Sequence, residues 1–217
     1  MDERPEPFRV GIVPGVTITR WTRAWEERRP GHPLKVVPLA EEEQRAALDD
    51  GLADVCFVRL PVDREGLDVI RLYAEAPVVV VSREHLLSLA DEVTLSDLEG
   101  EVVRHEPPAD AVEIVAAGAG VMRVPHSIAR LHSRKDVVAV PLTDAAETEI
   151  ALAWPHAATS DDIEYFVGIV RGRTATSSRG AEGTSSPKEQ KRKQKSGAAK
   201  KTATGRARAS GAGRRRR

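Results

Sequence analysis

The stretch DDGLADVCFVRLPVDREGLDVIRLYAEAPVVVVSREHLL, residues 49–87, decides the fold of this 217-residue chain. Gly51 ends a helix, because glycine adopts the left-handed conformation of such an end at no steric cost. Residues 53–58 are apolar apart from one aspartate, which predicts a parallel strand covered on both faces. Open α/β sheets bind ligands at the carboxyl ends of their strands. Arg59 and Pro61 follow this strand, so we expect a small-molecule site there.

The residues before this stretch continue the α/β pattern. Residues 8–13 and 34–39 are apolar runs that predict two further strands. Residues 41–50 predict a helix whose acidic residues cluster favourably at its amino end. Trp21 and Trp25 lie at helical spacing after the first strand, and we expect them in the core or in a dimer contact rather than in a base-stacking platform.

A second α/β unit follows residues 76–81, a continuous β-branched run that carries the chain out of the first sheet. Its helix stops at Gly118. Near the end of the body, Thr159 and Asp162 have the spacing of a capping box and predict a closing amphipathic helix. The further strands expected in the second unit are residues 101–104, 121–124, 137–142 and 150–154.

A net charge of zero conceals two parts of opposite charge. Residues 171–217 contain 16 Lys or Arg and 2 acids, whereas the rest of the chain contains 17 Lys or Arg and 31 acids. Residues 173–217 include no apolar residue larger than Ala, so this tail is expected to be disordered, as are residues 1–7.

The tail, with SPKEQKRKQK from Ser186 and RRRR at its end, resembles the Lys- and Ala-rich tails of histone-like DNA-binding proteins. We expect it to bind nucleic acid without reading sequence, because neutralised phosphates release counterions. A role in solubility, or docking on the acidic body, remains an alternative. The residues expected to contact nucleic acid are Lys188, Lys191, Arg192, Lys193, Lys195, Lys200, Lys201, Arg206, Arg208, Arg214, Arg215, Arg216 and Arg217.

Catalytic and metal-binding patterns are not found in the sequence. Cys56 is the only cysteine and lies in an apolar strand, which excludes an intramolecular disulfide and favours a reducing compartment. The six histidines lack the spacing of metal ligands, and no nucleophile or phosphate-loop motif is found. No signal core or membrane span is found either. We therefore expect a cytoplasmic, non-enzymatic protein with no metal and no cofactor.

Seven pieces of the chain, in order, resemble the effector-binding (substrate-binding) domain of LysR-type transcriptional regulators, from about Phe8 to Gly172. They are FRVGIVPG from Phe8, RPGHPLKVVPL from Arg29, LDDGLADVCFVRLP from Leu48, GLDVIRLYAEAPVVVVSREHLL from Gly66, VTLSDLEGE from Val93, IVAAGAGVMRVPHSIARLHSRKDVVAVPL from Ile114 and IEYFVGIVRG from Ile163. The resemblance implies an α/β fold of two Rossmann-like subdomains, similar to type 2 periplasmic binding proteins. Subdomain I would comprise residues 8–81 and 156–172, and subdomain II residues 82–155, with an effector in the cleft between them.

Two departures from the family pattern stand out. Met1 lies only a few residues before the first strand, so we expect a stand-alone domain that lacks the winged helix-turn-helix. Between Glu106 and Val112 the chain has only PPADA where the family has another strand and helix, so the second subdomain is expected to be shortened.

The expected effector is a small organic anion. Gly15, Val16, Thr17 and Thr19 precede or open the first helix, where unpaired N–H groups attract an anion, although Thr17 as a mere helix cap is an equal alternative.

Arg59 would hold a carboxylate bidentately, unless it pairs with Asp63 or Glu65 at the surface. Gly118 and Gly120 would face it from the second subdomain, or simply end a helix. The implied role is effector sensing in transcriptional regulation. The alternative is a degenerate interaction module that dimerises with full-length LysR-type regulators without an effector. A homodimer is the other partner arrangement expected.

Overall fold

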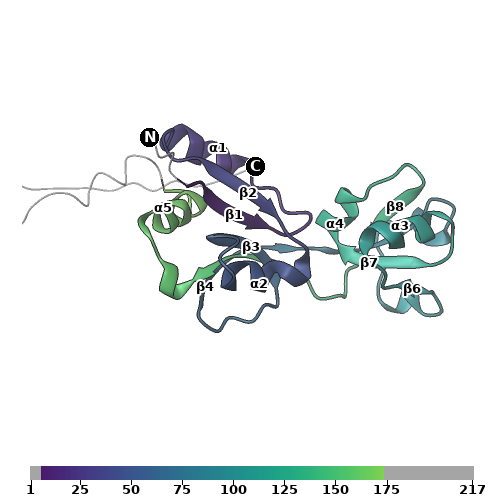
Figure 1. Cartoon of the computed structure of the whole chain (residues 1–217). Coiled ribbons are helices and arrows are strands. Elements are labelled where there is room, and N and C mark those ends of the chain that lie inside the picture. The colour runs from purple at the N-terminus through teal and green to yellow at the C-terminus, as the bar shows by residue number, and fades with distance from the viewer. Residues whose placement is uncertain (1–5, 174–217) are drawn as a thin grey trace, which may run out of the picture. The chain divides into compact units, whose positions relative to one another are not determined.

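The computed structural model describes residues 6–173, and two β-sheets organise this part of the chain (Figure 1). The predicted nucleic-acid-binding residues 188–217 and most of the segments expected to be disordered lie outside the described residues. No helix within the described range is long and apolar enough to cross a membrane.

The first sheet has five strands in the order β2-β1-β3-β9-β4. Its strands are β1 (Phe8–Ile12), β2 (Leu34–Pro38), β3 (Val55–Leu60), β4 (Leu67–Glu75) and β9 (Thr148–Pro155). The helical segments that accompany it are α1 (Thr19–Arg28), η1 (Glu41–Glu43), α2 (Gln44–Asp49), η4 (His156–Ala158) and α5 (Asp161–Val170). β1 pairs in parallel with β2 and β3, whereas β9 runs antiparallel to β3 and β4. We refer to this sheet and its helices as the first lobe.

Strand β3 is buried along its whole length, as its apolar sequence predicts. Because side chains alternate along a strand, Val55 and Phe57 face one core and Cys56 and Val58 face another. The strand is therefore covered on both faces, which places its carboxyl end, rather than its faces, within reach of a ligand.

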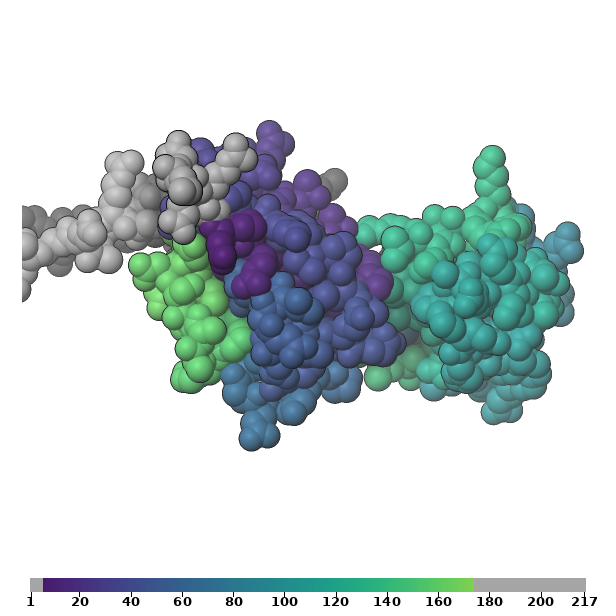
Figure 2. All heavy atoms as spheres, in the orientation of Figure 1, coloured from purple at the N-terminus to yellow at the C-terminus, as the bar shows by residue number. Residues whose placement is uncertain are grey.

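Aromatic side chains fill the core beneath α1 and α5. Phe8 stacks on Trp25 and Trp21 on Phe57, each at a centroid separation of 4.8 Å, and Phe166 of α5 meets Trp25 edge to face at 5.9 Å. Both tryptophans of α1 are thus core residues. In Figure 2 the green atoms of α5 lie against the purple and blue atoms of the first strands and helices, so the closing helix returns to the first lobe.

The second lobe is built on a four-stranded sheet in the order β6-β7-β5-β8. Its strands are β5 (Pro77–Ser82), β6 (Val103–Arg104), β7 (Val121–Pro125) and β8 (Val137–Pro141). One face is covered by α3 (Pro108–Ala116) and α4 (His126–Leu131), and the 3-10 segments η2 (Leu86–Leu89) and η3 (Ser96–Leu98) pack on the other. After β6 the chain enters α3 directly, and β6 stays at the edge of the sheet, which agrees with the expected shortening of this subdomain.

Two boundaries in the structure differ from the sequence expectation. β5 pairs only within the second sheet and β9 only within the first, so the chain crosses at Ala76 and again between β8 and β9, earlier than the expected limits at 81 and 155. An apolar run alone does not reveal which sheet a strand joins. The cap of α5 also differs: the Ser160 hydroxyl accepts the Ile163 N–H at 3.3 Å, whereas Thr159 donates to a backbone carbonyl.

Candidate ligand-binding site

The loop between β1 and α1 forms one wall of a site between the two lobes. Gly15 has φ +83°, and a Cβ built on it would lie 2.6 Å from the Ser127 Oγ of α4, so only glycine allows this close approach. Ile18, not Thr17, occupies the N-cap position of α1, and no side chain caps the helix. The interpretation of Thr17 as a cap is therefore wrong, and its exposed side chain is available to a ligand.

Two adjoining hollows, of about 490 and 320 Å³, lie against this loop. The first lobe supplies residues of the loop, α1 and β4, and the second lobe supplies the first turns of α4. The lining residues are Gly15, Val16, Thr17, Arg20, Trp21, Tyr73, Glu75, Ser127, Arg130 and Leu131. Three of the predicted residues, Gly15, Val16 and Thr17, are thus brought together here.

Arg59 lies beneath this site and is sealed by protein groups. Its Nε donates to Glu75 at 3.0 Å and its Nη1 to Glu41 at 2.7 Å, with only 3% of the side chain exposed. Its Nη2 reaches the Pro14 carbonyl at 3.0 Å and the Ser127 hydroxyl at 3.4 Å. The guanidinium therefore ties the first lobe to α4, and its partners are neither Asp63 nor Glu65, the alternatives that the sequence suggested.

Gln44 fixes the backbone at the same point. Its side chain is buried, donates to the Arg59 carbonyl at 3.0 Å and accepts the Arg59 N–H at 2.9 Å. These two bonds hold the end of β3 in register with α2, so the guanidinium of Arg59 is fixed beneath the hollows without lining them.

Two other guanidinium groups face the hollows. Arg20 stacks over the Trp21 ring at 4.2 Å, and Arg130 lies one turn along α4 from Ser127; neither forms an ion pair with a residue in the described range. Among the charged residues that line the hollows, two guanidinium groups, Arg20 and Arg130, outnumber the one carboxylate, Glu75, while Arg59 and Glu41 pair with each other beneath them. The excess of one positive charge suits a monoanion.

Tyr73 adds a hydrogen-bond donor. Its partial burial, reinforced by the negative charge of Glu75, raises the pKa of its phenol above the ordinary value. The hydroxyl therefore keeps its proton at neutral pH and is able to donate to an anion.

The remaining predicted site residues lie elsewhere. Thr19 opens α1 but does not line either hollow, and Pro61, joined to Leu60 by a cis peptide bond, is exposed beyond the end of β3. Gly118 and Gly120 do not face Arg59: they precede β7, at the amino end of this strand, whereas the site lies at the carboxyl end. A ligand in an α/β cleft meets the carboxyl ends of parallel strands, so the residues after β7 form the wall instead.

Sequence reasoning missed Arg20, Trp21, Tyr73, Glu75, Ser127, Arg130 and Leu131. A signal for two of them was present. The segment VMRVPHSIAR, from Val121, has the same order of strand, turn and helix as the first predicted unit. Ser127 and Arg130 therefore lie in the second lobe at a position equivalent to that of the β1–α1 loop in the first lobe.

Comparison with known proteins agrees with this geometry. A family model described as the LysR substrate binding domain matches residues 2–110. The chain belongs to this family. It is 26% identical to the HTH-type transcriptional regulator BudR of Raoultella terrigena, over 72% of this chain and 67% of that protein.

Solved structures show the same fold. The BenM effector-binding domain with its effector benzoate superimposes with a TM-score of 0.64 at 22% identity, covering 79% of this chain and 93% of that one. Oxidised OxyR of Corynebacterium glutamicum gives 0.63 at 22% identity, covering 76% of this chain and 63% of that one. The predicted type 2 periplasmic-binding-protein-like fold is confirmed, and the protein is a LysR-type effector-binding domain of transcription regulation.

Proposed function

We propose that this LysR-type domain is non-enzymatic and binds a small organic monoanion in the hollows between β1, α1 and α4. The observation that carries the proposal is the pair Arg20 and Arg130: two guanidinium groups without ion pairs among residues 6–173 face an uncapped helix end from opposite lobes. In such a position a carboxylate gains charge-assisted hydrogen bonds from both lobes. Binding would then favour one arrangement of the lobes, which is how a sensor transmits its state.

The non-enzymatic part of the proposal rests on the chemistry of the described residues. Burial raises the pKa of the Cys56 thiol to about 12, so it stays protonated and does not act as a nucleophile. The polar groups at the site are committed to holding Arg59 or to facing the hollow, and no hydroxyl among them is paired with a base.

Thermal shift with benzoate and a panel of small carboxylates tests the proposal. At a ligand concentration about 100 times the dissociation constant, unfolding free energy rises by about 2.7 kcal/mol. Arg130→Met should abolish most of the response, whereas Arg123→Met, which removes an exposed arginine of β7 outside these hollows, should leave it intact. No response to any carboxylate would refute effector binding.

One observation favours a second candidate: the second lobe passes from β6 directly into α3, so it contributes only α4 to the hollows. On this alternative the domain dimerises with full-length LysR-type regulators without an effector. Co-purification with such a regulator, combined with a flat response to the carboxylate panel, would favour it over sensing.

We also propose that the basic tail binds nucleic acid without reading sequence. Residues 171–217 contain 16 Lys or Arg and 2 acids, and this density favours phosphate contacts. The test compares DNA binding by the full chain and by a chain that ends at Gly172 across a salt series. Truncation should lower both the affinity and the salt slope; unchanged values would refute the assignment.

A further inference from the structure

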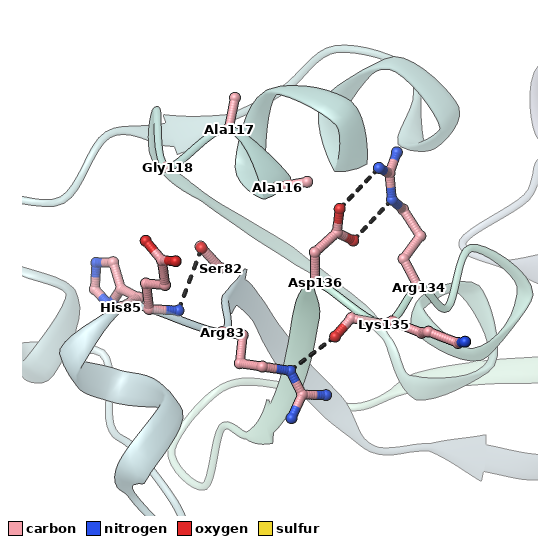
Figure 3. Close-up of a pocket in the computed structure, with 10 residues that line it drawn as sticks. Ser82, Arg83, His85, Ala116, Ala117, Gly118, Arg134, Lys135 and Asp136 are labelled. Carbon is pink, nitrogen blue, oxygen red and sulfur yellow. Dashed lines mark hydrogen bonds and ion pairs between the residues drawn. The ribbon is translucent and has the colours of Figure 1, made fainter.

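A larger hollow, of about 830 Å³, lies at the opposite end of the second lobe (Figure 3). β5 enters the lobe at Pro77, beside the crossing from the first lobe, and ends at Ser82, which borders this hollow. The end of α3 and the residues just before β8 complete its walls. The hollow is therefore separate from the site formed by the β1–α1 loop and α4, and it also contains Gly118, which the sequence had suggested for that site.

Arg83 and Lys135 form a positive side of this pocket. The Arg83 Nε donates to the Lys135 carbonyl at 2.7 Å and its backbone N–H to the Asp136 carbonyl at 2.9 Å, which holds the guanidinium in place. Its two terminal nitrogens, and the Lys135 ammonium group, have no hydrogen-bond partner within residues 6–173. A fixed guanidinium with two unused N–H edges is a receptor for a carboxylate.

Arg134 lines the pocket but is already occupied. Its Nε and Nη2 each donate to Asp136 at 2.9 Å (Figure 3). Its Nη1 pairs with Glu113 of α3. These bonds raise its pKa and lower that of Asp136, so both groups are charged at neutral pH. Together with Glu113 they form a cluster with one net negative charge that ties α3 to the segment before β8.

The end of α3 forms a negative side. The Gly118 and Ala119 N–H groups bond to the carbonyls of Val115 and Ile114, at 2.9 and 3.1 Å, but the next two carbonyls, of Ala116 and Ala117, receive no donor from the described residues. Unpaired carbonyls at a helix end carry partial negative charge and disfavour a plain anion.

Two polar side chains, Ser82 at the end of β5 and Glu84 just after it, complete the pocket. Ser82, only 8% exposed, accepts the Glu84 N–H at 3.4 Å through its hydroxyl oxygen, and within the described residues its O–H donates to no protein group. The carboxylate of Glu84 adds a full negative charge to the lining.

We propose that this pocket binds a small zwitterion of the amino acid class. The carboxylate of the ligand binds Arg83 and Lys135, and its ammonium group binds the Ala116 and Ala117 carbonyls and the Glu84 carboxylate. A ligand with both charges satisfies the two sides at once, whereas an anion or a cation alone leaves one side unpaired. The domain would then have a second small-molecule binding site, separate from the cleft between the lobes.

The test uses the nitrogen-labelled full chain and an NMR titration with glycine, β-alanine, γ-aminobutyrate and δ-aminovalerate. These probes share the two charges and differ in their separation. Valerate and amylamine serve as single-charge controls. The best zwitterion should shift the amides of Ser82 to His85 and of Ala116 to Gly118, with a dissociation constant about tenfold below that of either control, equivalent to about 1.4 kcal/mol.

Two variants locate the binding. Arg83→Met and Lys135→Met should each weaken the best zwitterion by about tenfold; the Lys135 side chain has no described partner, so its loss does not disturb the fold. Arg64→Met, an exposed arginine of the first lobe, is the matched control and should change nothing. The proposal is overturned if no zwitterion shifts these amides, if valerate binds as tightly, if the shifts fall on Gly15 to Thr17, or if the variants have no effect.

Discussion

Substitution of Glu75 tests how the ligand-binding site is supported. Glu75 and Arg59 form a buried ion pair at 3.0 Å with side-chain exposures of 5% and 3%, whereas the second partner of Arg59, Glu41, is 46% exposed. Removal of one member of a buried pair costs about 3–5 kcal/mol, because an uncompensated charge is left behind. Glu41 remains 2.7 Å from the guanidinium, so we expect Glu75→Gln to cost about 3 kcal/mol, the lower end of this range.

The matched control is Glu41→Gln, which removes an exposed partner and should cost less than about 1 kcal/mol. The double variant Arg59→Met/Glu75→Met removes both buried charges and should be less destabilised than Glu75→Gln, because apolar residues replace a buried pair at little cost. The burial of each partner therefore determines the expected order of the three variants in unfolding free energy.

Urea unfolding followed by tryptophan fluorescence measures these effects. All three tryptophans, Trp21, Trp25 and Trp154, are buried in the core of the first lobe, so the signal reports the lobe that contains the ion pair. With an m-value of about 2 kcal/mol/M, a loss of about 3 kcal/mol lowers the midpoint by about 1.5 M. Equal midpoints for Glu75→Gln and Glu41→Gln would refute the argument.

Three further outcomes follow from single residues. Burial raises the thiol pKa of Cys56 from 9.0 to about 12, so the unfolded state loses the thiol proton at a lower pH than the folded state. The free energy of unfolding should therefore fall as pH rises from about 9 toward 12, and it should fall less steeply in Cys56→Ala. Iodoacetamide should label the thiol only after unfolding. Gly120→Ala should cost at least about 2 kcal/mol more than Gly118→Ala in thermal melts, because both glycines have positive φ but only at Gly120 would a Cβ meet the Val102 carbonyl, at 2.3 Å. Ser160→Ala should lower the urea midpoint by the equivalent of about 1 kcal/mol and Thr159→Ala by much less; the reverse order would restore Thr159 as the cap.

Local sequence patterns were enough for the elements and their class. β3 was predicted from an apolar run bounded by Gly51 and Pro61, and α1 from the spacing of its tryptophans, because burial on both faces of a strand or along one stripe of a helix leaves a direct trace in the sequence. The seven ordered pieces that resemble LysR-type domains added the two-lobed fold. The loop from Gly15 to Thr17 was also predicted as a wall of the site, since it joins a parallel strand to a helix.

Tertiary structure decided which charged side chains form ion pairs within the protein and which remain available to a ligand. Arg59 was expected to meet a ligand, but Glu41, Glu75, Pro14 and Ser127 surround it, and these residues lie 16 to 68 positions away in the chain. No local pattern encodes such contacts, because they depend on how strands pair and how the lobes meet. The same holds for Arg20, Arg130 and Arg83: the sequence determines that each is an arginine, and only the packing around it determines whether its charge is already neutralised.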